Sequence, residues 1–104
     1  MPRRVVVTGL GLISPLGIGT KATWEGLVAG RSGVGPITKF DAEGFSARIA
    51  AEVKGFDPSK WFEAKEIKKF DTFVHYAVAA SDMAMEQSGL EIDDSNAHRV
   101  GVVI

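Results

Sequence analysis

The chain has 104 residues, of which 45% are hydrophobic, and its 12 basic and 13 acidic residues nearly cancel. This length and composition are typical of one globular domain, and the balanced charge gives no indication of nucleic-acid binding. Because the chain has no cysteine, disulfide bonds, thiolate metal sites and cysteine nucleophiles are excluded within these residues.

Membrane and metal binding are not indicated either. Asp82 and His75 interrupt the most apolar helical region, so no window reaches the length of a membrane span. Several glycines would break a signal helix after Arg3-Arg4. The two histidines, at positions 75 and 98, lack metal-ligand spacing with carboxylates. We therefore expect a cytoplasmic protein with no metal and no cofactor.

The first predicted element is a buried parallel strand from Arg4 to Thr8, indicated by three consecutive valines. It leads into a Gly-x-Gly at positions 9–11 that resembles the start of a dinucleotide-binding turn. That fingerprint needs a third glycine at position 14 opening a helix, where Ser14-Pro15 stands instead. Proline disfavours helical geometry in the residue before it. A nucleotide-binding turn is therefore disfavoured.

A helix is predicted from Thr20 to about Ala29, capped by Thr20 and ended by Gly30. Its inner face is expected to be a stripe of Trp24, Leu27 and Val28. Residues 31–36 contain two glycines and are predicted to form a loop.

Residues 47–53 alternate between apolar and charged side chains, which predicts a half-exposed strand, antiparallel or at a sheet edge. Asp57 followed by Pro58 predicts a short helical turn capped by Asp57.

A long helix is predicted from about Ala64 to Gln87, with Gly89 beyond its end. Arg99 to Ile104 then indicates a second buried parallel strand. A strand, a helical crossover and a second strand make a βαβ-like core, so the predicted class is α/β. Because the chain stops inside an apolar strand, we expect it to be part of a longer protein.

No catalytic constellation emerges from the sequence. Ser14 and Ser32 lack the flanking glycines of a nucleophile elbow, and no Gly-Lys-Ser/Thr of a Walker loop occurs. His75 follows Asp71 by one helical turn, which predicts an ion pair or hydrogen bond on the helix surface. Tyr76, Phe73 and Trp24 are expected in the core or at an interface.

The candidate for function is a basic cluster, in which Lys65, Lys68 and Lys69 stand at i, i+3 and i+4 shortly after Lys60. Near the N-terminus of a long helix, such cations oppose the helix dipole and repel one another. A basic face that local energetics disfavour suggests an anionic partner. A solvated helix end, partly neutralised by neighbouring carboxylates, explains the same pattern.

Several segments together resemble the β-ketoacyl-[acyl-carrier-protein] synthase family, especially its type II elongation enzymes. Any single motif is weak, but their order and spacing together are specific. The matching segments are Arg3–Gly11, Ser14–Gly17, Trp24, Gly30–Val34, Phe40-Asp41, Lys65–Ala77 and Arg99–Ile104. The resemblance implies that residues 1–104 are an incomplete N-terminal portion of a thiolase-like fold, which layers two related α/β halves and usually forms a homodimer.

The resemblance also implies a chemistry. Family members transfer an acyl group from acyl carrier protein to a cysteine and decarboxylate malonyl-carrier protein, whose carbanion attacks the thioester with the help of two histidines. The catalytic cysteine and histidines of these longer proteins lie downstream of Ile104, so neither His75 nor His98 inherits that role. The 104-residue chain is therefore expected to contain no catalytic residue and to be inactive alone.

Only a binding role carries over to this segment. Lys65, Lys68 and Lys69 match basic positions that meet the acidic recognition helix of the carrier protein in the family. The alternatives are a non-catalytic ketosynthase-like interaction subunit and a fragment of a polyketide ketosynthase.

Overall fold

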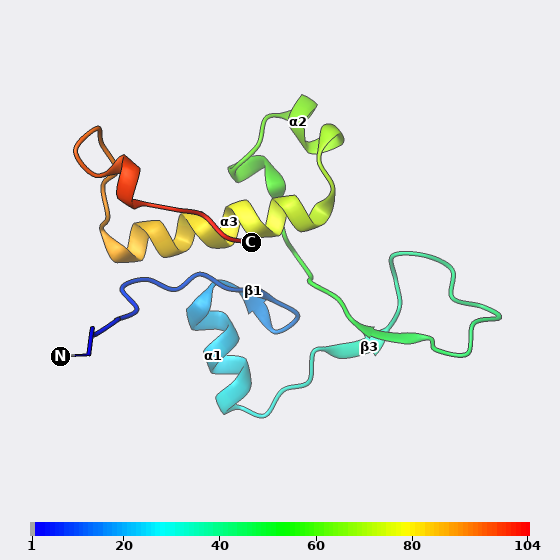
Figure 1. Ribbon diagram of the computed structural model, residues 1–104. Helices are drawn as coiled ribbons and strands as arrows, with labels where there is room; N and C mark the ends of the chain where they lie inside the picture. The colour runs from blue at the N-terminus through cyan, green and yellow to red at the C-terminus, as the bar shows by residue number, and fades with distance from the viewer. Residues whose placement is uncertain (1) are drawn as a thin grey trace.

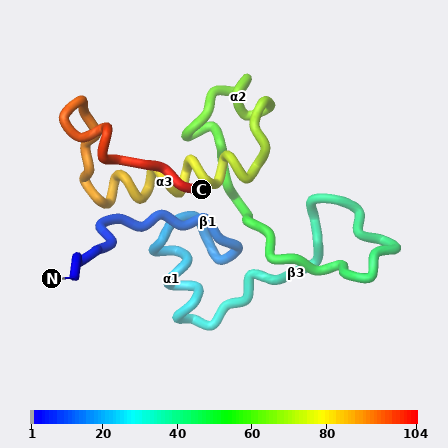
Figure 2. The backbone as a smooth tube through the Cα atoms, viewed as in Figure 1, coloured from blue at the N-terminus to red at the C-terminus, as the bar shows by residue number. Residues whose placement is uncertain are grey.

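A computed structural model describes residues 2–104. Figure 1 shows α3 across the middle of the molecule, with the N-terminal segment and α1 on one side and α2 on the other. Figure 2 traces the same path and shows the loop between β3 and β4 projecting away from the helices. The elements are β1 (Ile13–Ser14), β2 (Gly17–Ile18), α1 (Thr20–Val28), β3 (Val34–Pro36), β4 (Ile49–Ala51), the 3₁₀ helix η1 (Pro58–Lys60), α2 (Ala64–Lys69), α3 (Thr72–Ser88) and the 3₁₀ helix η2 (Ala97–Arg99).

The turn at Ser14-Pro15 is a tight antiparallel hairpin of β1 and β2, in which Ser14 pairs with Gly17. The Ser14 hydroxyl lies 2.8 Å from the hydroxyl of Thr23, which is buried on α1. Thr23 also donates to the carbonyl of Gly19 at 2.9 Å. The motif therefore anchors the hairpin to the start of α1 through side-chain hydroxyls.

Helix α1 lies close to its predicted bounds but buries a different face. Its cap is Gly19, whose φ of 100° favours glycine, and Thr20 is the first helical residue. The predicted inner stripe is wrong: Trp24, Leu27 and Val28 are 64%, 57% and 70% exposed. The buried residues of the helix are instead Thr23 and Gly26. Small side chains face inward because the hairpin, including Leu16 at Gly26, packs directly on this face.

The N-terminal segment crosses α3 at two glycines. A Cβ atom added to Gly9 would lie 2.1 Å from the carbonyl oxygen of Ala84, and one added to Gly11 would lie 1.9 Å from that of Ala80. The backbone N–H of Leu10 between them donates to the Gln87 side chain at 2.6 Å. The Gly-x-Gly therefore permits close contact between backbone and helix.

The two predicted parallel strands are not formed within the described residues. Residues 4–8 and 100–104 have no strand partner there, and both sheets are antiparallel pairs. The valine side chains of these segments are exposed to solvent, Val5 by 92% and Val103 by 99%. A strand requires a neighbouring strand to accept its backbone hydrogen bonds, and residues 2–104 place none beside either segment.

Strand β4 confirms the antiparallel edge predicted within residues 47–53. Its partner is β3, in the register Val34 to Ala51 and Pro36 to Ile49. The prediction of a loop over residues 31–36 is therefore wrong for the last three of them. The predicted turn after β4 is also confirmed, since the Asp57 carboxylate accepts from the backbone N–H of Ser59 at 3.0 Å and caps η1.

The predicted long helix is two helices. The backbones of Phe70 (φ −107°, ψ 143°) and Asp71 (φ −71°, ψ 159°) are extended and separate α2 from α3. Helix α3 ends as predicted at Gly89, which adopts left-handed geometry with φ of 66°. The docking candidates therefore lie on a separate six-residue helix.

Burial is slight throughout residues 2–104. Ala79 is the buried hydrophobic residue, and Thr23 and His75 are the buried polar residues. Among the described residues, no helix has both the length and the apolar character needed to cross a membrane.

Candidate functional site

The three predicted docking lysines, Lys65, Lys68 and Lys69, lie together on α2 and are exposed to solvent. The helix begins at a local cap, where the backbone N–H of Glu63 donates to the Glu66 carboxylate at 3.2 Å. Their i, i+3 and i+4 spacing places them on one side of the helix. The structure thus brings the sequence-predicted residues together.

The electrostatic setting of these lysines differs from the prediction. Because the backbone breaks at Phe70, Lys68 and Lys69 occupy the last turn of α2 and not the first turn of a long helix. Cations are favourable at that end, where the free carbonyls carry partial negative charge. The expectation that the helix dipole opposes the cluster is therefore wrong for these two residues.

The ion pairing of the cluster is uneven. The Lys65 ammonium lies 3.6 Å from the Glu63 carboxylate, and both side chains are mostly exposed. Among the described residues, Lys68 and Lys69 have no carboxylate within salt-bridge distance. The Lys69 ammonium lies 5.8 Å from the centre of the Phe70 ring. Within residues 2–104, the charges of Lys68 and Lys69 are therefore not neutralised by an ion pair.

His75 does not make the predicted surface interaction. It is 6% exposed, its ring centre lies 5.0 Å from that of Phe62, and its Nε2 atom is buried without a partner. Its contact with Asp71 is a backbone hydrogen bond of 3.4 Å, and no side-chain bond joins the two within the described chain. The prediction fails because Asp71 lies in extended backbone at the N-cap position of α3, while the His75 ring packs against Phe62.

A cluster of aromatic side chains connects η1 to α3. The Phe56 ring stacks on Trp61 at 5.5 Å and meets Tyr76 edge-on at 5.1 Å. The indole N–H of Trp61 donates to the Asp82 carboxylate at 3.0 Å. These contacts hold the segment before α2 against α3, which agrees with the packing role expected for Tyr76.

A groove opens beside this cluster, with a volume of about 450 Å³. The groove lies between the β3–β4 loop, the segment after β4, η1, α2 and the start of α3. The residues that line it are Lys39, Val53, Gly55, Phe56, Pro58, Ile67, Phe70, Asp71, Thr72, His75 and Tyr76. The Lys39 ammonium reaches the Tyr76 hydroxyl at 3.4 Å. The sequence pattern missed Lys39, since 37 residues separate it from Tyr76 and no periodicity relates them.

Glu52 fixes the backbone on which Lys39 stands. Its carboxylate accepts from the Thr38 hydroxyl at 2.9 Å and from the backbone N–H groups of Thr38 and Lys39, each at 3.2 Å. The Thr38 hydroxyl is the largest cause that lowers the pKa of Glu52 below its ordinary value of 4.5, and the two backbone N–H groups add to it. Glu52 is therefore held as a carboxylate that orders this corner.

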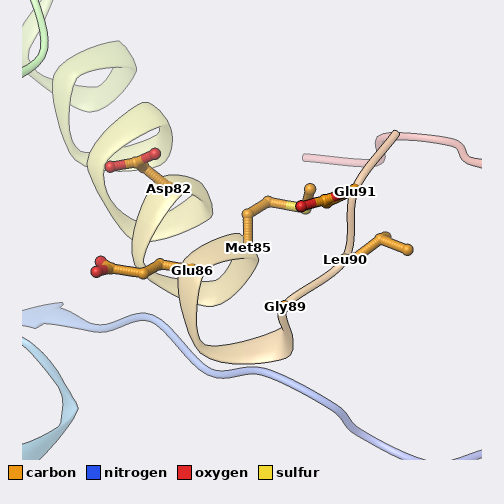
Figure 3. Close-up of a pocket in the computed structure, with 6 residues that line it drawn as sticks. All are labelled: Asp82, Met85, Glu86, Gly89, Leu90 and Glu91. Atoms are coloured by element: carbon orange, nitrogen blue, oxygen red, sulfur yellow. The ribbon is translucent and has the colours of Figure 1, made fainter. Parts of the chain in front are cut away.

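A second hollow, of about 540 Å³, lies at the far end of α3. Figure 3 shows the carboxylates of Asp82 and Glu86 on one side of the helix and Met85 reaching toward Glu91. No group of histidine, cysteine or acidic side chains among residues 2–104 is arranged to hold a metal ion. Lys65, Lys68 and Lys69 on α2, called the lysine face below, thus remain the candidate site.

Known proteins similar to this chain match it along almost its whole length. The sequence profile of the family described as "Beta-ketoacyl synthase, N-terminal domain" matches residues 2–104. The chain is 54% identical over 102 residues to a "3-oxoacyl-[acyl-carrier-protein] synthase 2" of Coxiella burnetii and 47% identical to one of Vibrio cholerae. These alignments include 98% of this chain and 25% of each relative, so the chain spans about a quarter of their length.

A solved structure confirms the architecture. "The ishigamide ketosynthase/chain length factor" is 47% identical, with a TM-score of 0.77 over 88% of this chain and 23% of that one. The mixture of helices and strands described above is therefore part of a thiolase-like α/β fold. The chain belongs to the β-ketoacyl synthase family, whose N-terminal-domain profile it matches.

Proposed function

We propose that the chain is the N-terminal portion of a 3-oxoacyl-[acyl-carrier-protein] synthase that elongates fatty acids. Such an enzyme condenses an acyl thioester with malonyl-[acyl-carrier-protein] and releases CO₂. The observation that carries the proposal is the identity of 47–54% to synthases of this name over 98% of the chain. The complete enzyme is proposed to act as a homodimer.

The residues of this segment supply no reacting group in the proposal. A thiolate is suited to the acyl transfer because it forms a thioester of energy similar to that of the donor. This chain has no cysteine, so the acyl group is carried elsewhere in the enzyme. His75 is buried against Phe62, which keeps its Nε2 atom away from any substrate. The segment therefore contributes scaffold and binding surface.

The proposed partner of the lysine face is acyl carrier protein, met through Lys65, Lys68 and Lys69. Exposed cations without internal carboxylate partners attract an acidic helix over several ångströms and accelerate its association. Support comes from the exposure of all three side chains and from the absence of ion pairs at Lys68 and Lys69 within the described residues.

Charge reversal tests the docking face. In the complete synthase, Lys65→Glu combined with Lys69→Glu is expected to weaken carrier-protein binding about tenfold at low salt, since two attractive rim charges become repulsive. The salt dependence of the affinity should also flatten, because screening has less attraction to remove. Fluorescence titration at several salt concentrations measures both effects.

Lys21→Glu is the matched control, because Lys21 is also an exposed helical lysine with a nearby carboxylate, Glu25, but lies on α1. It should leave carrier-protein affinity unchanged. Unchanged affinity of the Lys65/Lys69 variant at low salt would contradict the assignment of this face.

A second candidate is a ketosynthase-like subunit of polyketide synthesis, either catalytic or not. The observation that favours it is the 47% identity to the ishigamide ketosynthase/chain length factor, which equals that to the Vibrio cholerae synthase. Mass spectrometry of the complete protein after incubation with acyl-carrier protein separates catalytic from non-catalytic versions. A covalent acyl group on a cysteine supports the condensing enzyme, and its absence supports a non-catalytic subunit.

A further inference from the structure

The charged side chains of α2 and its cap are sorted along the helix axis. Glu63 and Glu66 lie at the N-cap and in the first turn, whereas Lys68 and Lys69 lie in the last turn. The Glu66 carboxylate accepts from the backbone N–H of Glu63 at 3.2 Å, which holds it at the N-terminal end. Lys65 is the second residue of the helix and lies at this acidic end. The three docking lysines therefore do not share one electrostatic environment.

Lys65 already has a partner within the described chain. Its ammonium lies 3.6 Å from the Glu63 carboxylate, whereas Lys68 and Lys69 have no carboxylate of that chain within salt-bridge distance. To contact a carboxylate of another protein, Lys65 must give up or share its pair with Glu63. Lys68 and Lys69 exchange only water. Because exposed ion pairs have similar small energies, the pair lost at Lys65 offsets most of the pair gained.

The two cations of the last turn have neighbours that leave their charge intact. The Lys69 ammonium lies 5.8 Å from the centre of the Phe70 ring, and an aromatic face attracts a cation without neutralising it. Asp71, two residues further along, makes no ion pair with Lys69 among the described residues. The free carbonyls of the last turn also favour Lys68 and Lys69 where they stand.

We propose that the carrier protein is bound mainly by Lys68 and Lys69, and that Glu63 is a specificity-determining residue that restrains Lys65. The proposal rests on the proposed docking role of the lysine face and adds an order and a direction to it. The partner's carboxylates must lie at the C-terminal end of α2. Carboxylates placed at the other end meet Glu63 and Glu66 and are repelled, so partners of the wrong orientation are disfavoured.

Three single substitutions in the complete synthase test the order of the lysines. We expect Lys68→Gln and Lys69→Gln each to weaken carrier-protein binding about threefold at low salt, and Lys65→Gln by less than about twofold. These differences should fade at high salt, because exposed charges are screened. Fluorescence titration at several salt concentrations measures them. Lys21→Gln on α1 is the matched control and should leave the affinity unchanged.

Removing the charge of Glu63 tests its role directly. We expect Glu63→Gln to strengthen carrier-protein binding about twofold at low salt, since Lys65 no longer has to leave a partner. In the Glu63→Gln background, Lys65→Gln should weaken binding as much as Lys68→Gln does, and a double-mutant cycle measures this coupling. Glu25→Gln is the matched control, because it removes the carboxylate beside Lys21 on α1 and makes the same change in net charge. Circular dichroism and melting temperature check that each variant is folded.

The outcomes separate this inference from the docking role itself. If no substitution on the lysine face changes the affinity at low salt, the docking role and the inference both fail. If Lys65→Gln weakens binding as much as the other two substitutions, the inference is overturned and the docking face stands. The same holds if Glu63→Gln strengthens binding equally with and without Lys65, because the carboxylate then repels the partner without restraining that lysine. An equal gain from Glu25→Gln would also overturn the inference, since net charge would explain both effects.

Discussion

At the scale of single residues, the glycines at positions 9 and 11 are required because the backbone of α3 lies against them. The sequence pattern was sufficient to reject a phosphate-binding turn, because Ser14-Pro15 stands where a helix should open. It could not show what the glycines contact. That information depends on a helix some 70 residues further along, whose backbone at Ala80 and Ala84 approaches them. Local patterns identify a tight position but not its distant neighbour.

Adding one methyl group at Gly11 should therefore be costly. We expect Gly11→Ala to destabilise the complete protein by about 1–3 kcal/mol, since the backbone of α3 must move away from the new Cβ atom. The matched control is Gly35→Ala, because a Cβ atom at Gly35 has open space around it. Thermal melting followed by circular dichroism measures the difference. Equal melting temperatures for the two variants would contradict the close crossing.

At the scale of elements, periodicity located the helices but not the break between α2 and α3. Apolar residues keep their spacing of three or four positions on both sides of Phe70-Asp71. Hydrophobic periodicity therefore predicts one continuous helix and does not detect the two extended residues. A signal was nevertheless present, because aspartate is a preferred residue immediately before a helix. This break also reversed the electrostatic argument for Lys68 and Lys69, which lie at a favourable helix end.

The corner formed by β3, β4 and Lys39 should respond to pH through Glu52. Its folded-state pKa is lowered, so its stabilising contribution is fully present above the ordinary value of 4.5 and is lost as the pH falls below it. We expect hydrogen-exchange protection of the Thr38 and Lys39 amides, corrected for intrinsic rates, to decrease as the pH falls from 6 toward 3 (roughly the range in which a carboxylate is neutralised).

Two variants decide whether Glu52 is responsible. Glu52→Gln should show weak protection of these amides at every pH, because a neutral amide oxygen is a poorer acceptor than a carboxylate. Glu43→Gln is the control, since the Glu43 carboxylate makes no hydrogen bond among the described residues. A pH dependence that persists in Glu52→Gln would rule out this assignment.

At the scale of the whole molecule, residues 2–104 are far more open than a compact domain. The radius of gyration is 17.3 Å, against about 13 Å for a compact chain of this length. The accessible surface is 8530 Å², against roughly 5,700 Å² for a compact protein of this size. The valine runs near both ends were predicted as buried strands and are exposed here. Hydropathy identified their apolar character, but burial depends on neighbours that residues 2–104 do not provide.

The 104-residue chain alone should therefore lack cooperative unfolding. With Ala79 as the buried hydrophobic residue, too little apolar surface leaves water to offset the loss of chain entropy. We expect a gradual thermal transition, weak near-ultraviolet circular dichroism and binding of an apolar dye. A sharp calorimetric transition with native-like aromatic signals would contradict this expectation. The complete synthase, measured in parallel, should unfold cooperatively.

The two extended residues between α2 and α3 place the proposed docking lysines on a separate element from the helix that receives Gly9 and Gly11. Substitutions on the lysine face of α2 leave untouched the helix that receives Gly9 and Gly11. Selection can alter the charge of this face toward a different partner without repacking α3. On the docking proposal, homologues can diverge in partner preference while their scaffold stays constant, and differences among them should concentrate on the lysine positions of α2.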